Sequence, residues 1–290
     1  MLNKVFWNWD IHYACNFRCS YCFLAEKWDV AFKENRYPGV DKWIEVWDTI
    51  YEKYGSCHIH FSGGEPFTYP DFFTLIISLS RKHTLEFSTN LSFDVNHFVE
   101  KMNPKIARLN ASFHPELSNL EEFLEKIRHL KINGFRVSVS FVAYPPHLKE
   151  MEEISAKCRE RGVTLIIQLF RGQYREKGYP EDYTESEAGL IKLHGGSLFA
   201  NRTQLIRNLH QKAEIKKMCK MGQVYGKIYA SADVYRCCSN GALKIGNLLD
   251  DEDFELLCGP QPCEIKDCVC WKRMVLGEES EWTPHWVSVS

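Results

Sequence analysis

Residues 5–23 read VFWNWDIHYACNFRCSYCF. The stretch from residue 5 to residue 11 is rich in aromatic and β-branched side chains, which is typical of a strand. The strand leads into a loop that carries Cys15, Cys19 and Cys22 in the spacing C-x3-C-x2-C. Three thiolates on one short loop can each bind one iron of a cubane iron–sulfur cluster, so that the fourth iron has no protein ligand. A small molecule can then complete the coordination of that open iron.

A zinc site, or cysteines that are simply buried, is the alternative for this loop. Zinc needs a fourth Cys or His close to the other three in order to complete a tetrahedron. The nearest candidate is His12, and its position just before the loop matches zinc spacings poorly. The spacing therefore favours an iron–sulfur cluster over zinc.

Beyond the loop, short β-rich runs alternate with helical patterns. Strands are predicted at 5–11, 57–61, 85–88, 106–112, 136–142 and 164–169. Helices are predicted at 41–54, 70–81, from about 95, at 120–133 and at 148–161. Such repeats predict an α/β fold with a parallel sheet, and we expect a partial (β/α)6 TIM-like barrel. Sites in such folds lie at the carboxyl ends of the strands, where the cysteine loop also falls.

The turn after the second predicted strand reads Gly63, Gly64, Glu65, Pro66. Together with the cysteine loop, this turn resembles the radical SAM superfamily over about residues 5–170. Members carry C-x3-C-x2-C followed by an aromatic residue, here Phe23, and a Gly-Gly-Glu-Pro turn after the second strand. The resemblance implies that a 4Fe-4S cluster on the loop binds S-adenosylmethionine (SAM) through its open iron. It also implies that the backbone of the turn binds the amino group of SAM, since glycine permits a close approach.

Further residues match SAM-contacting positions of the family. Ser88 and Asn90 end the third predicted strand, and Ser112 ends the fourth. Tyr21 is expected to reach SAM from the cluster loop. Polar residues at strand ends also occur in ordinary turns, and that alternative stays open for each of them.

The resemblance implies the chemistry as well. An electron from a reductase, a flavodoxin or a ferredoxin reduces the cluster, and SAM is cleaved to a 5′-deoxyadenosyl radical that abstracts a hydrogen atom from the substrate. Hydrogen abstraction needs no general base, so we assign no catalytic side chain. Glu65 and His114 are expected to be structural or binding groups.

The C-terminal part of the chain has a different pattern. We expect a radical SAM core at 1–200, with the barrel ending near 170 and a linker or lid after it, and a small α+β metal-binding extension at 201–290. Residues around 232–233 are predicted to join two strands of a hairpin. The cysteines resemble the SPASM and Twitch extensions of radical SAM enzymes, and we expect one auxiliary iron–sulfur cluster; zinc is the open alternative. The expected ligands are Cys219, Cys237 and members of the group Cys263, Cys268 and Cys270.

Composition limits the function classes. Lys and Arg number 36 against 38 acidic residues, without a basic run, which disfavours a nucleic-acid partner. Neither a secretory signal nor a membrane-spanning segment is predicted, and we expect a cytoplasmic protein. Twelve cysteines in a reducing compartment are better explained as ligands or core residues than as disulfides.

The substrate is predicted only by class. The cysteine loop begins at residue 15, without a recognition domain before it, and we therefore expect a small-molecule substrate. One alternative is a peptide-modifying enzyme that matures ribosomally made peptides. The other is a non-catalytic iron–sulfur or zinc redox protein, which the Gly-Gly-Glu-Pro turn disfavours because such a protein needs no SAM site.

Overall fold

A computed structural model of the chain describes residues 4–25, 28–195, 218–239 and 241–262. Its strands are β1 (Phe6–His12), β2 (His58–Gly63), β3 (Thr84–Thr89), β4 (Ala107–Ser112), β5 (Arg136–Ala143), β6 (Thr164–Leu169), β7 (Gly172–Tyr174), β8 (Lys177–Tyr179), β9 (Met218–Cys219), β10 (Tyr225–Ile228), β11 (Asp233–Tyr235), β12 (Lys244–Asn247) and β13 (Gln261–Pro262). Its helices are α1 (Trp28–Ala31), α2 (Val40–Tyr54), α3 (Phe72–Leu79), α4 (Val95–Lys101), α5 (Leu120–Ile132) and α6 (Met151–Glu160), with 3-10 turns η1 (Phe32–Glu34), η2 (Pro66–Thr68) and η3 (Pro145–Glu150). Within these ranges, no helix is both long enough and apolar enough to cross a membrane.

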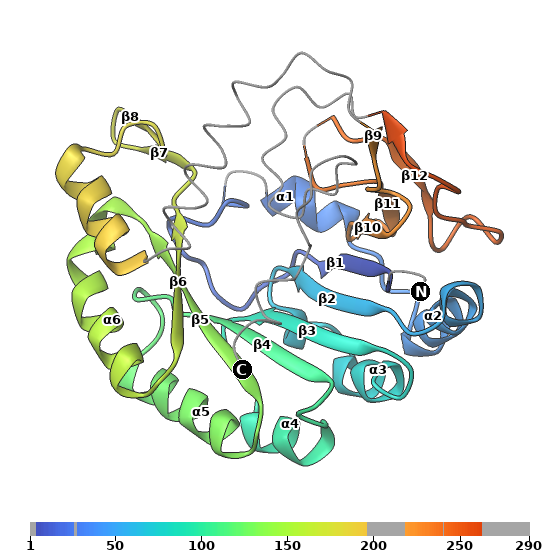
Figure 1. The fold of residues 1–290 in the computed structure, drawn as a ribbon, viewed down its shortest axis with the longest axis horizontal. Helices are drawn as coiled ribbons and strands as arrows, with labels where there is room; N and C mark the ends of the chain where they lie inside the picture. Colours follow the sequence, from blue (N-terminus) through green and yellow to red (C-terminus); the bar gives the residue numbers. More distant parts are fainter. Residues whose placement is uncertain (1–3, 26–27, 196–217, 240, 263–290) are drawn as a thin grey trace.

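The centre of the molecule is a nine-stranded sheet in the order β12-β11-β10-β1-β2-β3-β4-β5-β6. Strands β1 to β6 are parallel to one another. Helices α2 to α6 lie along the outer side of the curved sheet (Figure 1). The predicted partial (β/α)6 barrel is confirmed.

Alternation along β1 separates an apolar face from a polar one. Successive side chains of a strand point to opposite faces. Trp7 and Trp9 are fully buried, and their rings lie 4.6–5.9 Å from those of Trp43 and Trp47 of α2. Together with Ile11, this aromatic layer forms the core between sheet and helices, and Asn8 and Asp10 on the opposite face of β1 point to the inside of the barrel.

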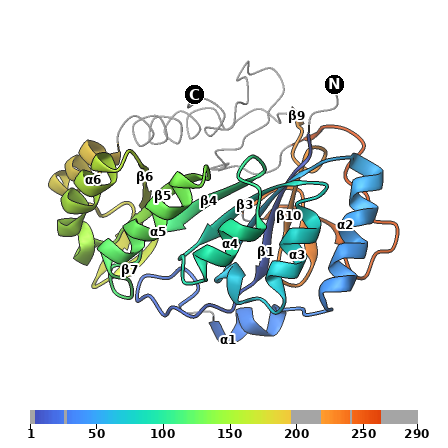
Figure 2. The ribbon, with the colours of Figure 1, turned by 90° about the horizontal axis from the view of Figure 1, so that it is seen from below.

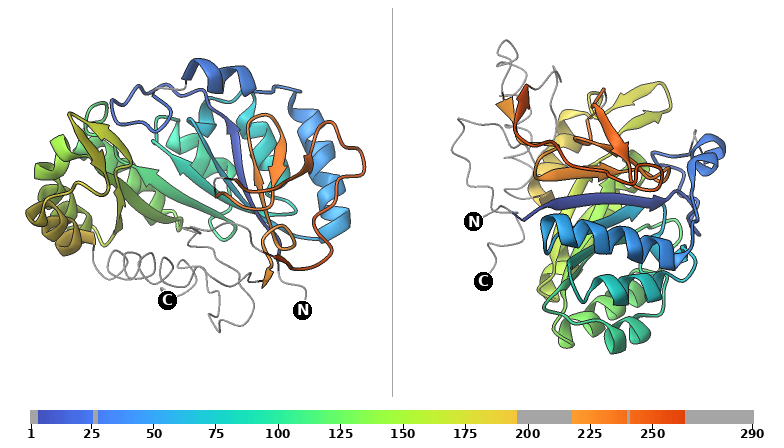
Figure 3. Two further views of the ribbon diagram at one scale, coloured as in Figure 1. Left: turned by 90° about the horizontal axis from the view of Figure 1, so that it is seen from above. Right: turned by 90° about the vertical axis from the view of Figure 1, so that its right-hand side faces the viewer.

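The C-terminal strands continue the barrel sheet. β10 pairs in parallel with β1, from Phe6 opposite Tyr225 to Trp9 opposite Ile228. β10 and β11 form the predicted antiparallel hairpin, with Ala232 in the turn at a φ of 67°. The described strands β10 to β12 of the expected extension thus lie beside β1 in the same sheet (Figure 3), and its boundary at 200–201 stays a prediction.

The residues after β6, where a linker or lid was predicted, have regular secondary structure up to residue 195. β7 and β8 form an antiparallel hairpin, and residues 185–195 are helical. Tyr179 and Tyr183 pack with each other and with the cluster of rings around Phe170. The hydroxyl of Tyr183 also donates to the carbonyl of Ala143 at the end of β5. The segment is therefore attached to the carboxyl end of the barrel.

The turn after β2 lies directly against the end of β1. The amides of Gly64 and Glu65 donate to the carbonyls of His12 and Ala14, at 2.8 and 2.9 Å. A Cβ on Gly63 would lie 2.2 Å from the carbonyl oxygen of His12, and one on Gly64 would lie 2.0 Å from that of Ala14. Both glycines are thus required by the packing of one main chain on another.

This packing can be tested with Gly64→Ala. The added methyl group has no space, because its neighbour is backbone, and forced overpacking destabilises by about 1–3 kcal/mol or more. We expect a lower Tm and a reduced iron content after anaerobic reconstitution. The matched control is Gly189→Ala, where nothing lies within 4 Å of the added Cβ. Equal Tm values for the two variants would contradict the packing argument.

Candidate functional site

The loop at residues 13–25 follows β1 and crosses the carboxyl ends of the strands (Figure 2). Glu116, which follows β4, holds this loop in place. One of its oxygens accepts a hydrogen bond of 2.8 Å from the amide of Ser20, and the other accepts one from the Ser20 hydroxyl. His147 of η3 supports Glu116 through its Nε2 at 3.3 Å. Residues 96 positions apart in the sequence therefore fix the cysteine loop.

The three thiols of the loop have polar groups beside them. The amide of Phe17 donates to Cys15 Sγ at 3.3 Å. His114 Nδ1 lies 3.3 Å from Cys19 Sγ and 3.1 Å from Tyr21 Oη. Hydrogen bonds to the sulfurs are one of the means by which proteins set the potential of an iron–sulfur cluster. The surroundings of the thiols thus suit thiolate ligands.

Burial raises the pKa of all three thiols, and that of Cys19 to about 12. The loop therefore carries neutral thiols until a metal displaces their protons. Within the residues that the structure describes, no three His, Cys, Asp or Glu side chains converge on a single ion. A cubane distributes its thiolates over different irons, so its ligands share no single ion. The donor set of Cys15, Cys19 and Cys22 fits such a cluster.

The carboxylate and the carbonyl of Glu65 both accept hydrogen bonds from other residues of the protein. Its carboxylate is 1% exposed and accepts hydrogen bonds from the amides of Phe67 and Asn90 and from the hydroxyl of Thr89, at 2.7–3.1 Å. Burial raises its pKa to about 7, although these donors act in the opposite direction. Its carbonyl accepts from His12 Nε2 at 2.8 Å. Glu65 thus has a structural role, and His12 is bound to it rather than to the cysteines.

The amides of the Gly-Gly-Glu-Pro turn are likewise occupied, since Gly64 and Glu65 donate to the end of β1. An ammonium group needs acceptors rather than donors. The contact of SAM with this turn stays a prediction; it would need carbonyl acceptors, and that of Glu65 already accepts from His12 and Thr68. Pro66 begins η2, and its buried side chain packs beside the turn.

The other predicted SAM contacts each have a partner in the protein. Ser88 Oγ lies 2.9 Å from His60 Nε2, and Ser112 Oγ lies 3.0 Å from Ser140 Oγ. Asn90 donates from Nδ2 to Asn16 Oδ1 at 3.0 Å, and so ties the cluster loop to the end of β3. All three lie at the carboxyl ends of strands, as expected, and a role in binding SAM stays a prediction.

The two aromatic residues of the loop differ in their surroundings. Phe23 was expected to be part of the site, yet its side chain is 70% exposed. Tyr21 is 7% exposed, and its ring lies 6.0 Å from that of His114 and 5.1 Å from that of Tyr144. Tyr21, one position before Cys22, therefore packs against neighbouring rings, and a role of Phe23 or Tyr21 in binding SAM stays a prediction.

A row of hydrogen-bonded polar side chains crosses the inner face of the sheet. Lys227 of β10 donates to Asn8 at 2.7 Å and pairs with Asp10 at 2.6 Å. Asn8 Nδ2 is 2.9 Å from His60 Nδ1, and His60 Nε2 is 2.9 Å from Ser88 Oγ. The row therefore connects the extension with the third strand of the barrel. The inside of the barrel is polar and largely pre-arranged.

The second cysteine group lies at the amino end of β1. Cys219 and Cys237 are buried in one cluster with Phe6, and Figure 2 shows β9 near the amino end of β1 while α1 is near the opposite end. Ser239 Oγ is buried and has no partner within the described residues, which fits a site for a further group. Cys238 is exposed, which favours Cys237 as the ligand. The remaining expected ligands lie outside the described residues: Cys263, Cys268 and Cys270.

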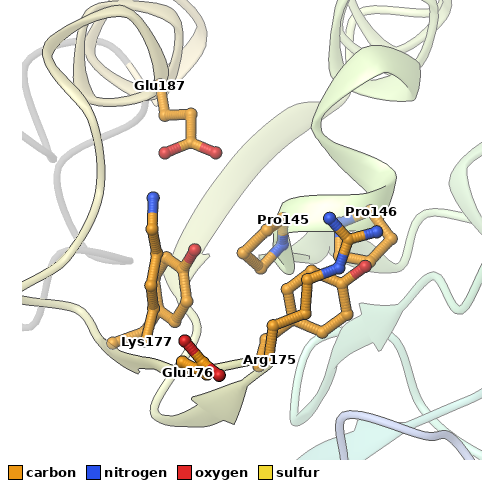
Figure 4. Close-up of a pocket in the computed structure, with 8 residues that line it drawn as sticks. Pro145, Pro146, Arg175, Glu176, Lys177 and Glu187 are labelled. Atoms are coloured by element: carbon orange, nitrogen blue, oxygen red, sulfur yellow. The ribbon is translucent and has the colours of Figure 1, made fainter.

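A cavity of about 640 Å³ lies at the β7–β8 hairpin, beside the site (Figure 4). Its lining combines prolines, tyrosines and charged residues: Pro145, Pro146, Tyr174, Arg175, Glu176, Lys177, Tyr179 and Glu187. In Figure 4 Lys177 and Glu187 point toward each other across the cavity. Tyr174 and Tyr179 also pack in the ring cluster that contains Tyr21 and Cys19. The cavity is thus one aromatic layer away from the cysteine loop.

Several residues of the site were not predicted from the sequence. His114 was noted without a contact, and the others were missed: Asp10, His60, Glu116, His147 and Lys227. Polar residues at every second position of β1 and β2 were the available signal for Asp10 and His60. Glu116 and His147 follow strands β4 and β5, and no local pattern distinguishes them from other loop residues.

Comparisons with known proteins identify relatives of this chain. A mycofactocin maturase, MftC, of Mycobacterium tuberculosis (strain CDC 1551 / Oshkosh) is 22% identical over 85% of this chain and 68% of its own length. The MftC of Mycobacterium ulcerans (strain Agy99) is 24% identical over 85% and 72%. In these relatives the match extends past the barrel into the region of the second cysteine group.

Solved structures show the same fold. The structure of anSMEcpe with bound AdoMet and Cp18Cys peptide has a TM-score of 0.58 at 15% identity, and it covers 86% of this chain and 78% of that one. Streptococcus suis SuiB bound to precursor peptide SuiA has a TM-score of 0.58 at 14% identity, and it covers 87% and 64%. The radical SAM superfamily itself matches residues 9–170, from the middle of β1 to the end of β6. With its C-x3-C-x2-C loop held at the carboxyl ends of a partial barrel, this chain belongs to the radical SAM superfamily and is a radical SAM enzyme.

Proposed function

We propose that the enzyme modifies a peptide, and that an auxiliary iron–sulfur cluster on Cys219 and Cys237 takes part in the reaction. The relatives support the substrate class: the MftC proteins are named maturases, and the anSMEcpe and SuiB structures contain peptides. The expectation of a small-molecule substrate rested only on where the chain begins. The peptide alternative is therefore the better supported of the two.

The observation that carries the proposal is the placement of the two cysteine groups at opposite ends of β1. Cys15 follows its carboxyl end, whereas Cys219 and Cys237 pack on Phe6 at its amino end. At about 3.3 Å per residue, β1 is roughly 20 Å long. An extended peptide of about six residues has the same length. A peptide along the polar inner face would therefore reach from one cysteine group to the other.

The side chains of this chain position and enclose the reactants. When bound, the cluster and SAM supply a 5′-deoxyadenosyl radical that removes a hydrogen atom from the substrate. Cys15, Cys19 and Cys22 would hold the cluster, and Glu116 and His147 fix their loop over the barrel mouth. Tyr21 and its ring cluster exclude water there. The row from Lys227 to Ser88 offers donors and acceptors for the amides of a peptide.

Substitution of the first cysteine group tests the cluster assignment. We expect about eight irons per chain in the reconstituted wild-type enzyme, and roughly half of that in the variant Cys15→Ala, Cys19→Ala, Cys22→Ala, since two cubanes hold four irons each. Formation of 5′-deoxyadenosine from SAM should stop, because these thiolates hold the iron that SAM binds. Iron analysis and chromatography measure both. Continued cleavage of SAM at the wild-type rate would refute the assignment.

The substrate class is tested directly. The reconstituted wild-type enzyme is incubated anaerobically with SAM, dithionite and short peptides encoded next to its gene. We expect a mass change in one peptide that depends on SAM, with 5′-deoxyadenosine formed in proportion. The triple cysteine variant is the control. A small molecule that is turned over while every such peptide stays unmodified would overturn the peptide proposal.

The inner polar row is tested with Lys227→Met. The change removes the ion pair to Asp10 and the hydrogen bond to Asn8, so that a carboxylate that is 14% exposed loses its cation. We expect less product per 5′-deoxyadenosine formed, by about tenfold, because a poorly held substrate wastes SAM. The matched control is Lys244→Met, which breaks the more exposed pair to Asp233 in the same extension. An equal product ratio in both variants would show that the row does not position the substrate.

A further inference from the structure

Arg236 connects β9, which carries Cys219, with β13. Its Nε donates to the carbonyl of Met221 at 3.2 Å, and Nη1 donates to that of Pro262 at 2.9 Å. Nη2 donates to the carbonyls of Cys219 and Gln261, at 3.4 and 3.2 Å. β13 pairs with β9 in the same place. The guanidinium therefore lies among four carbonyls, next to Cys219 and one position before Cys237.

The charge of Arg236 is buried without a carboxylate partner. The residue is 9% exposed. In the described part of the chain, its guanidinium forms no ion pair with an Asp or Glu, whereas Arg36 pairs with Asp250 and Lys227 pairs with Asp10. A buried cation is unfavourable unless an anion compensates it. Carbonyl oxygens satisfy its hydrogen bonds but supply no net charge.

We propose that Arg236 is the counter-charge and positioning residue of an anionic metal–thiolate cluster on Cys219 and Cys237; this inference rests on the auxiliary cluster proposed above. Cysteine thiolates give such clusters a net negative charge. The hydroxyl of Ser239, two positions after Cys237, is buried without a partner among the described residues and would bond such a group. Arg236 would hold β9, which carries Cys219, and offset the charge of the cluster.

The inference has an electrochemical consequence. Reduction adds one negative charge to the cluster, and a cation nearby in a medium of low dielectric constant stabilises the reduced state most. Loss of the guanidinium charge should therefore lower the reduction potential of the auxiliary cluster. A residue that only ties strands together would change the stability of the extension without this shift in potential.

The experiment compares wild type, Arg236→Gln and Arg236→Lys, all as full chains reconstituted anaerobically. Potentiometric titration followed by electron paramagnetic resonance separates the two clusters, and the first cluster serves as the internal reference. We expect Arg236→Gln to disfavour reduction of the second cluster at least tenfold, which is 59 mV for one electron. Arg236→Lys, which keeps the charge, should lie closer to wild type. The control Arg36→Gln removes an exposed Arg that pairs with Asp250 and should leave both potentials unchanged.

The potentials and the iron content of the Arg236 variants decide between a role of charge and a purely structural role. A fully loaded Arg236→Gln with an unchanged second potential overturns the inference, as do equal shifts in the Gln and Lys variants. If Arg236→Gln holds only the first cluster, retention of the second by Arg236→Lys supports the role of charge, and its loss from both refutes it. About four irons and one zinc in the wild-type protein would instead refute the auxiliary iron–sulfur cluster itself.

Discussion

The main chain of Gly63 and Gly64 packs on that of His12 and Ala14 at a distance that excludes any Cβ. This contact joins the end of β2 to the start of the cysteine loop, and the buried carboxylate of Glu65 extends it to β3 through Thr89 and Asn90. Three strand ends are thereby held together around one turn. The loop can then cross the barrel mouth to Glu116, because it is anchored both at its start and at Ser20.

Much of the barrel follows from local patterns. Aromatic and β-branched runs predicted six parallel strands, and the alternation of Trp7 and Trp9 with polar residues agrees with a sheet that is covered by helices on one face. The spacing of Cys15, Cys19 and Cys22 predicted a cluster loop because ligand spacing within a loop is a local property. Residues 251–257 contain a turn at 252–253, and the carboxylate of Asp251 accepts a hydrogen bond from the amide of Asn247.

Other features depend on contacts between distant residues, and the sequence patterns do not contain them. The pairing of β10 with β1 joins residues more than 200 positions apart, and nothing in the sequence of β10 specifies a parallel partner. The hydrogen bonds of Glu65 could not be predicted either, since a Glu in a glycine-rich turn is equally consistent with a ligand. Phe23 and Tyr21 flank the same cysteine, and only the packing against His114 and Tyr144 distinguishes them.

The proposed role of both cysteine groups in one reaction depends on the same long-range pairing. Because β10 lies beside β1, the ion pair of Lys227 with Asp10 places a residue of the extension on the inner face of the barrel. The extension is therefore part of the inner wall of the barrel. Arg236 bonds the main chain of the cysteine segment at the amino end of β1, and Glu116 bonds that of the cysteine loop at the carboxyl end. The carboxylate of Glu116 accepts from an amide of the cysteine loop, whereas the guanidinium of Arg236 donates to carbonyls of the extension. The two side chains carry opposite charges because one segment offers a backbone donor and the other offers backbone acceptors.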